Sequence, residues 1–457
     1  MKSVYKLSRA ALLVAGVIAA SMAIAETSPL EEALKVPGAK PEIPVTQVKT
    51  GFDQPFIDEA RDKFGNFHMQ MGGDHALYYT IKMTEFMPSA LAMPHGEVSP
   101  LKRNIDSSLN DLTFVMGDGE QSVSLGEYIH DDKTRVQGIM ILKGGEVVYE
   151  SFPGMNPEQT HIWASVSKTA VGTILTMLEM EGKVDTSKPI TQYVPELKGT
   201  EWDKVSLLDA INMASGLDIS ENAANTLDPN SVFQRMLSAD FNVPNPQGEI
   251  EDEMQVLRDV VPLEGEEPGK VARYSSTVTK VLGVAIENVE QQPYTQVFED
   301  RIWSKIGARA SAQINITPAG HAVAYGMINS RLDDLARYGL IFTPSWNTVA
   351  KAPVVPTQVI EQMQKGGNHE AYMAGDFTHH SWVQAAFGLD MPIYNSHQWD
   401  AVWDDGAMFK HGNLYQSLYV DPARDVVGVA YSTSPVYLTP DLIPGYLREA
   451  AKQLADK

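Results

Sequence analysis

Apolar side chains at helical spacing define one long helix in the first half of the chain. Between residues 170 and 181 they recur every three or four positions, at Val171, Ile174, Leu175 and Leu178. This spacing is typical of a helix with one buried face, and Gly182 provides the usual end signal. Ser165 and Lys168 come just before these positions, and a helix would place both on one face.

Apolar runs predict strands on both sides of this helical region. Residues 138–143 and 146–150 flank Gly144-Gly145, a dipeptide typical of tight hairpin turns. A closing helix is predicted at residues 440–455, after three further strands at residues 407–410, 416–420 and 426–433. Strands joined by short turns favour an antiparallel sheet, so the predicted fold class is α+β, with the sheet flanked by helices.

The middle of the chain predicts a mainly helical lobe at about residues 165–320. Residues 220–265 are acidic and poor in strand signals, and a helix is expected after Tyr274. Further helices are predicted at residues 293–306 and 331–341, the second with Ser330 as its N-cap. A domain at residues 110–457 would then consist of this lobe and a sheet lobe, formed by residues 110–164 together with 321–457.

Residues 26–109 form an N-terminal extension whose role the pattern does not indicate. The extension is rich in proline and charged residues, with a possible helix at residues 58–64 and an alternation at 75–83 that suggests a strand. It could be a lid, a strap across the main domain, or a surface for a partner.

The first 25 residues have the three parts of a secretory signal peptide. Lys2, Lys6 and Arg9 form a positive head, residues 10–20 have no polar side chain, and Ala23-Ile24-Ala25 is a small-residue cleavage site. We expect cleavage after Ala25 and a periplasmic or secreted location. No later stretch reaches about 18 uninterrupted apolar residues, so no membrane span is expected.

Composition indicates a large globular protein that uses no cysteine chemistry. The 457 residues are 43% hydrophobic and 21% charged, and the absence of cysteine excludes disulfides and a cysteine nucleophile. Removal of the signal peptide would leave 33 basic residues against 58 acidic ones, a net charge of −25. Such a charge argues against nucleic acid or an anionic membrane as partner. It leaves the oligomeric state open.

Ser165 and Lys168 form a Ser-x-x-Lys pattern at the start of the predicted helix. A serine is a weak nucleophile until a base removes its proton, and a lysine one turn away can assist that step. The pattern also occurs at Ser3 and Ser99, so it has little weight alone. Its weight increases with two later motifs, Tyr274-Ser275-Ser276 and Lys410-His411-Gly412.

These three motifs, in this order, resemble those of the serine β-lactamase and penicillin-binding-protein superfamily. Members carry Ser-x-x-Lys, then Tyr-x-Asn or Ser-x-Asn, then Lys-Thr-Gly or a variant. The resemblance covers roughly residues 110–455, and within the class C β-lactamase-like branch it is closest to 6-aminohexanoate-dimer hydrolases and related esterases. Tyr274-x-Ser276, Val281-Leu282-Gly283 and Gly307-Ala308 point to that branch.

The resemblance implies a role for each motif and a β-lactamase/transpeptidase-like fold. Ser165 would be the acylated nucleophile, with Lys168 and Tyr274 managing its proton. Cations could make Tyr274 a base by holding its phenolate, since its ordinary pKa is near 10. The backbone N–H groups of Ser165 and Asn413 would form the oxyanion hole. The remaining substrate-binding positions would be Lys410, His411, Gly412 and Ser276.

Three residues depart from the superfamily pattern, and all affect substrate choice. Ser276 replaces an asparagine, and His411 replaces the hydroxyl residue that would meet a substrate carboxylate. Tyr415 stands where the nylon-oligomer hydrolases tend to have glycine.

Other candidates have plainer explanations. His369, Asp376 and His379-His380 could be zinc ligands, but adjacent histidines on a strand point to opposite faces, so we expect no metal and no cofactor. His161 and His397 are expected to be structural or to line the substrate site. An apolar pocket wall or ordinary packing would explain Trp382, Phe387, Trp399 and Trp403.

The predicted function is an exported serine hydrolase that cleaves a small linear amide or ester through an acyl-enzyme on Ser165. One alternative is a β-lactamase or a D-Ala-D-Ala carboxypeptidase, although the Tyr-x-Asn amide and the Lys-Thr-Gly hydroxyl are absent. An alternative of another class is a binding or sensor protein that keeps the fold without turnover.

Overall fold

The main sheet has seven strands, and every neighbouring pair in it is antiparallel. The computed structural model describes residues 34–435 and 440–455, so the predicted signal peptide lies outside the described residues. In spatial order the strands are β3 (Glu146–Ser151), β2 (Val136–Lys143), β11 (Val426–Ser432), β10 (Gln416–Asp421), β9 (Met408–Gly412), β8 (Trp399–Val402) and β7 (Tyr394–Ser396).

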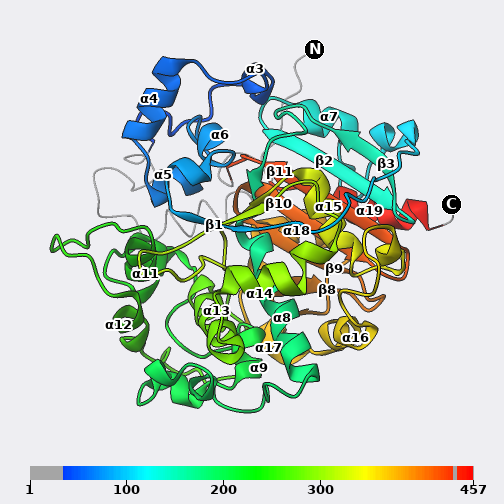
Figure 1. Ribbon diagram of the computed structural model, residues 1–457. Coiled ribbons are helices and arrows are strands. Elements are labelled where there is room, and N and C mark those ends of the chain that lie inside the picture. Colours follow the sequence, from blue (N-terminus) through cyan, green and yellow to red (C-terminus); the bar gives the residue numbers. More distant parts are fainter. Residues whose placement is uncertain (1–33, 436–439, 456–457) are drawn as a thin grey trace.

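The predicted hairpin is present as β2 and β3. Gly144 and Gly145 have φ values of 58° and 77°, the left-handed conformation that a tight hairpin turn requires at both central positions. The first strands meet the last ones, because β2 pairs with β11 from Val136 opposite Ser432 to Lys143 opposite Val426. Figure 1 shows this neighbourhood as cyan β2 beside orange β11.

Helices cover both faces of this sheet. Gly339 of α15 (Leu332–Leu340) packs against Val427 of β11, whereas the next residue, Gly428, packs against Leu447 of α19 (Ile443–Leu454). Since successive residues of a strand point to opposite faces, α15 and α19 lie on opposite sides. All residues of β10 and β11 are therefore buried, which explains the nearly continuous apolar run of β11.

A mainly helical part of the fold contains the helix that follows Ser165. That helix, α8, is buried at every position from Lys168 to Leu178 and packs against α13, α14 and α16. The lobe contains α8 (Lys168–Met180), α9 (Leu207–Ile211), α10 (Ala223–Leu227), α11 (Val232–Asp240), α12 (Glu253–Arg258), α13 (Ser276–Glu290) and α14 (Tyr294–Arg301). In Figure 1 it forms the green half of the molecule.

Shorter helices complete the structure. The remaining α-helices are α3 (Val45–Val48), α4 (Gln54–Asp62), α5 (Asn66–Met71), α6 (Ala76–Tyr79), α7 (Leu125–His130), α16 (Thr357–Lys365), α17 (His369–Ala374) and α18 (Ser381–Phe387). The 3₁₀ helices are η1 (Met83–Glu85), η2 (Ser107–Asp111), η3 (Ala164–Ser167), η4 (Ile190–Gln192), η5 (Pro195–Leu197), η6 (Glu201–Lys204), η7 (Trp303–Lys305), η8 (Pro344–Thr348), η9 (Phe377–His379) and η10 (Asn413–Tyr415).

A second sheet, which the sequence pattern did not predict, ties the N-terminal extension to the rest. Its four strands, all antiparallel, are β1 (Ser89–Ala92), β5 (Ala312–Asn315), β6 (Ile328–Ser330) and β4 (His161–Ile162), in that spatial order. Eleven residues after the end of β1, Arg103 forms a bridge with Val147 of β3. Residues 89–92 thus form the edge strand of the second sheet, and residues 103–106 bond to the edge strand β3 of the main sheet.

Two local predictions were wrong. Residues 75–83 contain the helical turn α6, not a strand. All four residues from Ala76 to Tyr79 are buried, so apolar side chains occur on every side of this turn and no alternation between a buried and an exposed face could be read from them. Ser330 is the last residue of strand β6, and the N-cap of α15 is Arg331. The hydroxyl of Ser330 accepts a hydrogen bond from the indole N–H of Trp163. Among the residues that the structure describes, no helix has the length and apolar character to cross a membrane.

Candidate active site

Ser165 lies in η3, a single turn that leads directly into α8. The helix predicted around Ser165 therefore begins three residues later, at Lys168. Ala164 has a φ of +45°, a left-handed conformation that residues with a side chain seldom adopt. Such strain persists only where the surrounding packing enforces it, and it is common at functional sites.

Lys168 is fully buried and points its amino group at three oxygen atoms. Its Nζ lies 2.9 Å from Ser165 Oγ, 2.9 Å from Ser276 Oγ and 2.7 Å from the carbonyl oxygen of Tyr325. Burial lowers the pKa of Lys168 to about 7, against the opposing effect of Glu221. A neutral Lys168 amine has two N–H groups, which can donate to Ser276 Oγ and to the carbonyl oxygen of Tyr325. Its lone pair can then accept the proton of the Ser165 hydroxyl.

Tyr274 lies between two lysines. Lys410 Nζ is 3.4 Å from Tyr274 Oη, and the amino nitrogens of Lys168 and Lys410 lie 5.1 Å and 4.7 Å from the centre of its ring. Burial raises the pKa of Tyr274 well above its ordinary value, and the charges of Asp400 and Glu221 raise it further. The surroundings thus favour a protonated phenol near neutral pH over the phenolate considered from the sequence.

Lys410 has a carboxylate partner that sequence reasoning missed. Asp400 lies on β8, and the antiparallel register brings it beside Lys410 on β9. Its Oδ1 is 2.5 Å from Lys410 Nζ, and its Oδ2 accepts a 3.0 Å hydrogen bond from the backbone N–H of His411. The signal that could have revealed this register is Asp405-Gly406, a turn dipeptide between the two strands.

Ser276 and Glu221 adjoin the catalytic lysine candidate. Ser276 is the first residue of α13, where its hydroxyl accepts the hydrogen bond from Lys168. Glu221 accepts a 2.6 Å hydrogen bond from the backbone N–H of Ser276, and its own N–H donates to the carbonyl of Tyr274 at 2.9 Å. Glu221 is in a loop, and no motif marks it in the sequence.

Strand β9 ends directly against the turn that carries Ser165. A Cβ atom on Gly412 would lie 2.8 Å from the carbonyl oxygen of Trp163, so the close approach requires glycine. Asn413 follows, and its side-chain amide donates a 3.0 Å hydrogen bond to the carbonyl of Gln70 in α5. Asn413 thus comes directly after the contact of Gly412, and the role of its backbone N–H in an oxyanion hole stays a prediction.

The turn after Asn413 has an unusual backbone that a glutamine side chain stabilises. Leu414 and Tyr415 have φ values of 60° and 73°. Gln416 Nε2 donates to the carbonyl of Asn413 at 3.0 Å and to that of Ser432 at 2.7 Å. The position where related hydrolases tend to have glycine is thus left-handed here, although tyrosine occupies it.

Two neighbours fix the ring of His411. Its Nε2 lies 3.1 Å from Asp441 Oδ2, and its ring stacks on Trp382 with centroids 4.8 Å apart and planes 3° from parallel. Tyr415 contacts the ring at 6.0 Å between centroids. Burial raises the pKa of Asp441, while the hydrogen bond from His411 lowers it.

The histidines considered as zinc ligands have other surroundings. His369 Nδ1 is 2.6 Å from the carbonyl of Ile393, His379 ends η9, and His380 Nε2 is 3.9 Å from Asp376. Within residues 34–435 and 440–455, no group of three or more histidine, cysteine, aspartate or glutamate side chains could hold a metal ion.

Other residues considered from the sequence belong to the core. His161 and His397 are buried, and burial lowers the pKa of each to about 4, so both are neutral near pH 7. The aromatic side chains considered as a pocket wall are also buried, namely Trp382, Phe387, Trp399 and Trp403.

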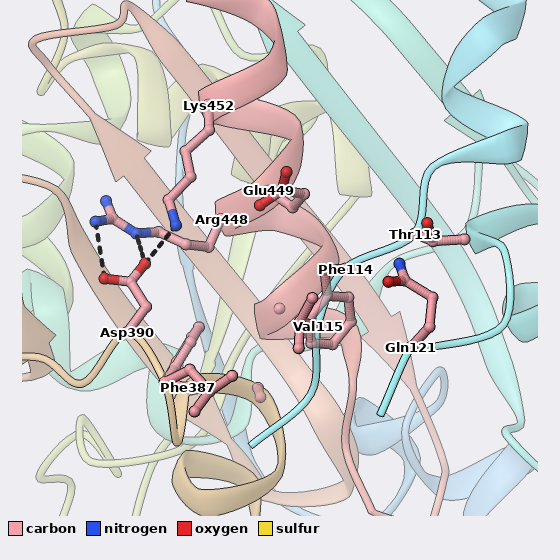
Figure 2. Close-up of a pocket in the computed structure, with 12 residues that line it drawn as sticks. Thr113, Phe114, Val115, Gln121, Phe387, Asp390, Arg448, Glu449 and Lys452 are labelled. Carbon is pink, nitrogen blue, oxygen red and sulfur yellow. Dashed lines mark hydrogen bonds and ion pairs between the residues drawn. The ribbon is translucent and has the colours of Figure 1, made fainter. Parts of the chain in front are cut away.

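A cavity lies apart from these motifs, between α18, α19 and residues 113–121 (Figure 2). Asp390 in its wall forms ion pairs with Arg448 at 2.9 Å and with Lys452 at 2.6 Å. Phe387, considered from the sequence as part of a pocket wall, lines this cavity, whereas Ser165, Lys168, Tyr274 and Lys410 do not.

Known proteins similar to this chain are hydrolases. A family model described as Beta-lactamase matches residues 127–452. A 6-aminohexanoate-dimer hydrolase of Paenarthrobacter ureafaciens is 27% identical over 362 residues, which span 79% of this chain and 86% of that protein.

Solved structures agree on the fold. A candidate 6-aminohexanoate-dimer hydrolase from Bacillus anthracis is similar with a TM-score of 0.66 and 20% identity, over 83% of this chain and 94% of the other. The hydrolase EstCE1, described as having promiscuous acyltransferase activity, has a TM-score of 0.51 and 16% identity, over 70% and 94%. Because the family match spans well over half of the chain, we conclude that the protein belongs to the Beta-lactamase family, as its three motifs predicted.

Proposed function

We propose that this protein is an exported serine hydrolase that cleaves a small linear amide or ester through an acyl-enzyme on Ser165. The observation that carries the proposal is the contact between Lys168 Nζ and Ser165 Oγ at 2.9 Å, with a lysine pKa of about 7. A base is most effective when its pKa is close to the working pH.

In the first step, Lys168 accepts the proton of Ser165 while Oγ attacks the scissile carbonyl carbon. The carbonyl oxygen becomes an oxyanion, which the backbone N–H groups of Ser165 and Asn413 stabilise. Loss of one such donor costs about 3–4 kcal/mol of transition-state stabilisation in other enzymes.

Collapse of the tetrahedral intermediate breaks the bond to the amine or alcohol, which must gain a proton as it leaves. Tyr274 donates that proton from its phenol and regains one from Lys168, which holds the proton of Ser165. Lys410, 3.4 Å from Tyr274 Oη, stabilises the transient phenolate. Water then attacks the ester on Ser165 by the same route, releasing the acid and restoring the serine.

The linear substrate is supported by similarity and by the motif departures. The relative that is 27% identical is named for hydrolysis of a 6-aminohexanoate dimer. Ser276 hydrogen-bonds Lys168, and the ring of His411 is packed against Trp382, so the two positions differ from the amide and hydroxyl of β-lactam recognition. The pattern of residues 1–25 supports export.

A direct test is covalent labelling of Ser165 followed by turnover assays. The mature protein and Ser165→Ala would be treated with a fluorophosphonate probe and measured by intact mass. Ser99→Ala is a matched control, because Ser99 starts another Ser-x-x-Lys pattern outside the proposed site. We expect one adduct on the wild type and on Ser99→Ala, and none on Ser165→Ala.

The substrate panel would contain p-nitrophenyl butyrate, a 6-aminohexanoate dimer, a D-aminoacyl amide, a penicillin and a cephalosporin. Turnover of the ester or a linear amide that disappears in Ser165→Ala supports the proposal. Rapid β-lactam turnover would instead indicate a β-lactamase. A folded protein with no adduct and no turnover would indicate the binding or sensor protein.

A further inference from the structure

We infer that residues 66–80 of the N-terminal extension are a positioning element of the active site, which fixes the two halves of the oxyanion hole relative to each other. The inference rests on the proposed hydrolase function, in which the backbone N–H groups of Ser165 and Asn413 hold the oxyanion. Residues 66–80 contain α5, α6 and Thr80. This segment contacts both of the chain segments that carry the two proposed donors.

The turn that carries Asn413 is held by α5. The side-chain amide of Asn413 donates a 3.0 Å hydrogen bond to the carbonyl oxygen of Gln70. The following residue, Leu414, is 3% exposed and packs against Gly72, where an added Cβ atom would lie 2.8 Å from Leu414 Cδ2. Leu414 has a φ of 60°, and a left-handed residue with a side chain persists only where its surroundings enforce that conformation. Contact with α5 is one such constraint on the backbone next to Asn413.

The other half of the proposed hole is held by the residue after α6. The backbone N–H of Ile162 donates a 2.8 Å hydrogen bond to the carbonyl oxygen of Thr80, which is buried. Ile162 is the last residue of the short strand β4, three residues before Ser165. The same short segment of the extension therefore contacts the chain on both sides of the close approach between Gly412 and Trp163.

The segment is itself anchored to the main sheet through Arg135. Asp74 lies 3.1 Å from Arg135 Nη1, and the side chains of Arg135 and Asp74 are 1% and 10% exposed. The backbone carbonyl of Arg135 accepts a 3.2 Å hydrogen bond from Ser432 Oγ. The backbone of Ser432 exchanges two hydrogen bonds with the side chain of Gln416, which also donates to the carbonyl of Asn413. A displacement of the segment would therefore reach the Asn413 turn by two routes.

This placement matters because an oxyanion hole is effective only when its donors are fixed before the reaction begins. N–H groups that must first move toward the oxyanion lose much of the stabilisation that a preorganised pair provides. The Asn413 turn has two consecutive left-handed residues, Leu414 and Tyr415, so its backbone would relax if the contacts around it were removed. The buried contacts favour a strap over a lid or a partner surface as the role of this part of the extension.

The test compares two variants that loosen these contacts from opposite sides. Asn413→Ala removes the hydrogen bond to Gln70 and leaves the backbone N–H in place. Gly72→Ala changes the extension alone, because the added Cβ atom meets Leu414 and Pro435.

Each variant has a matched control. Asn288→Ala also removes a side-chain amide that donates to a backbone carbonyl at 3.0 Å, that of Tyr193, away from the three motifs. Gly96 has a φ of +84°, close to the +77° of Gly72, but among the residues that the structure describes no atom lies within 4 Å of an added Cβ. Gly96→Ala therefore introduces a similar backbone strain without a new contact.

The readouts are kcat/KM for p-nitrophenyl butyrate and the inhibition constant of 1,1,1-trifluoropentan-2-one. Addition of Ser165 Oγ to the ketone carbonyl, with the serine proton passing to Lys168, gives a tetrahedral oxyanion of the kind that the hole would bind. A smaller fraction of active enzyme does not change this constant, so a merely structural loss cannot imitate the effect. We expect the inhibition constant to rise and kcat/KM to fall at least about fivefold in Asn413→Ala and Gly72→Ala, with both within about twofold of the wild type in the controls.

The outcomes separate this inference from the proposed function. A smaller rise of the inhibition constant in either folded variant, or an equal rise in its control, overturns the inference while the hydrolase function stands. Failure of the ketone to inhibit a wild type that turns over the ester also overturns it. If urea titration shows that Gly72→Ala does not fold, Asn413→Ala decides. Absence of Ser165-dependent turnover in the wild type would overturn the proposed function and, with it, this inference.

Discussion

Replacement of Lys168 by arginine tests the proposed base most directly. Arginine stays protonated at every accessible pH, so it can donate hydrogen bonds to Ser165 but cannot accept its proton. In the wild type the pKa of about 7 leaves about half of the Lys168 side chains neutral at pH 7. A positioned general base contributes about 10²–10⁴ in rate, so Lys168→Arg should lower kcat/KM about 10³-fold, or about 4 kcal/mol.

The same reasoning fixes the pH dependence of the wild type. Because the neutral amine is the active form and burial lowers the pKa of Lys168 to about 7, activity should be lost as pH falls through that value. Between pH 7 and pH 5 the neutral fraction drops about 50-fold, so kcat/KM should drop by a similar factor. The pKa of Tyr274 is raised, so its phenol should not cause a second loss near neutral pH.

The assay is kcat/KM for p-nitrophenyl butyrate between about pH 5 and pH 9, corrected for spontaneous hydrolysis. Lys183→Arg, a change of the same kind at an exposed lysine beyond α8, is the control and should match the wild type. Circular dichroism and the urea midpoint check that each variant is folded. A flat profile through pH 7, or a Lys168→Arg enzyme within about tenfold of the wild type, would refute Lys168 as the base.

Three further changes test the surrounding structure. Tyr274→Phe removes the proton donor and should lower kcat about 10²-fold for an alkyl amide but less for a nitrophenyl ester, whose leaving group needs no proton; equal losses on both would argue against this role. Gly412→Ala places a Cβ 2.8 Å from the carbonyl oxygen of Trp163 and should reduce kcat/KM at least about tenfold with little change in urea midpoint, so unaltered kinetics would contradict the requirement for close approach. Asp74→Ala leaves the buried guanidinium of Arg135 without the carboxylate 3.1 Å away and should lower the free energy of unfolding by about 3 kcal/mol in urea titration; a change below about 1 kcal/mol would mean that this part of the extension adds little stability.

The elements predicted correctly are those whose signals are local. Apolar spacing located α8, and a Gly-Gly turn located the hairpin of β2 and β3. The second sheet had no such signal, because its strands have two to four residues and pair Ser89 with Asn315, far apart in the chain. Apolar pattern also failed for α6, where every side chain is buried.

In the candidate site, too, the residues within short motifs could be predicted from the sequence, whereas their neighbours from distant parts of the chain could not. The contacts of Lys168 with Ser165 and Ser276 agree with the grouping that the motifs suggested. Asp400 and Glu221 were missed because a single carboxylate has no distinctive pattern, and its importance depends on strand register or loop path. The charge balance of the site therefore could be read only from the structure.

The pairing of β2 with β11 has a consequence for how the chain folds. The two strands are separated by about 300 residues, so the central sheet cannot close until nearly the whole polypeptide has been synthesised. Contacts this distant along the chain slow folding, and a nascent chain would keep the inner edge of β2 unpaired throughout its synthesis. If the protein is exported as proposed, this delay is useful, because a chain that has not yet collapsed can pass through a translocation channel and then fold outside the compartment in which it was made.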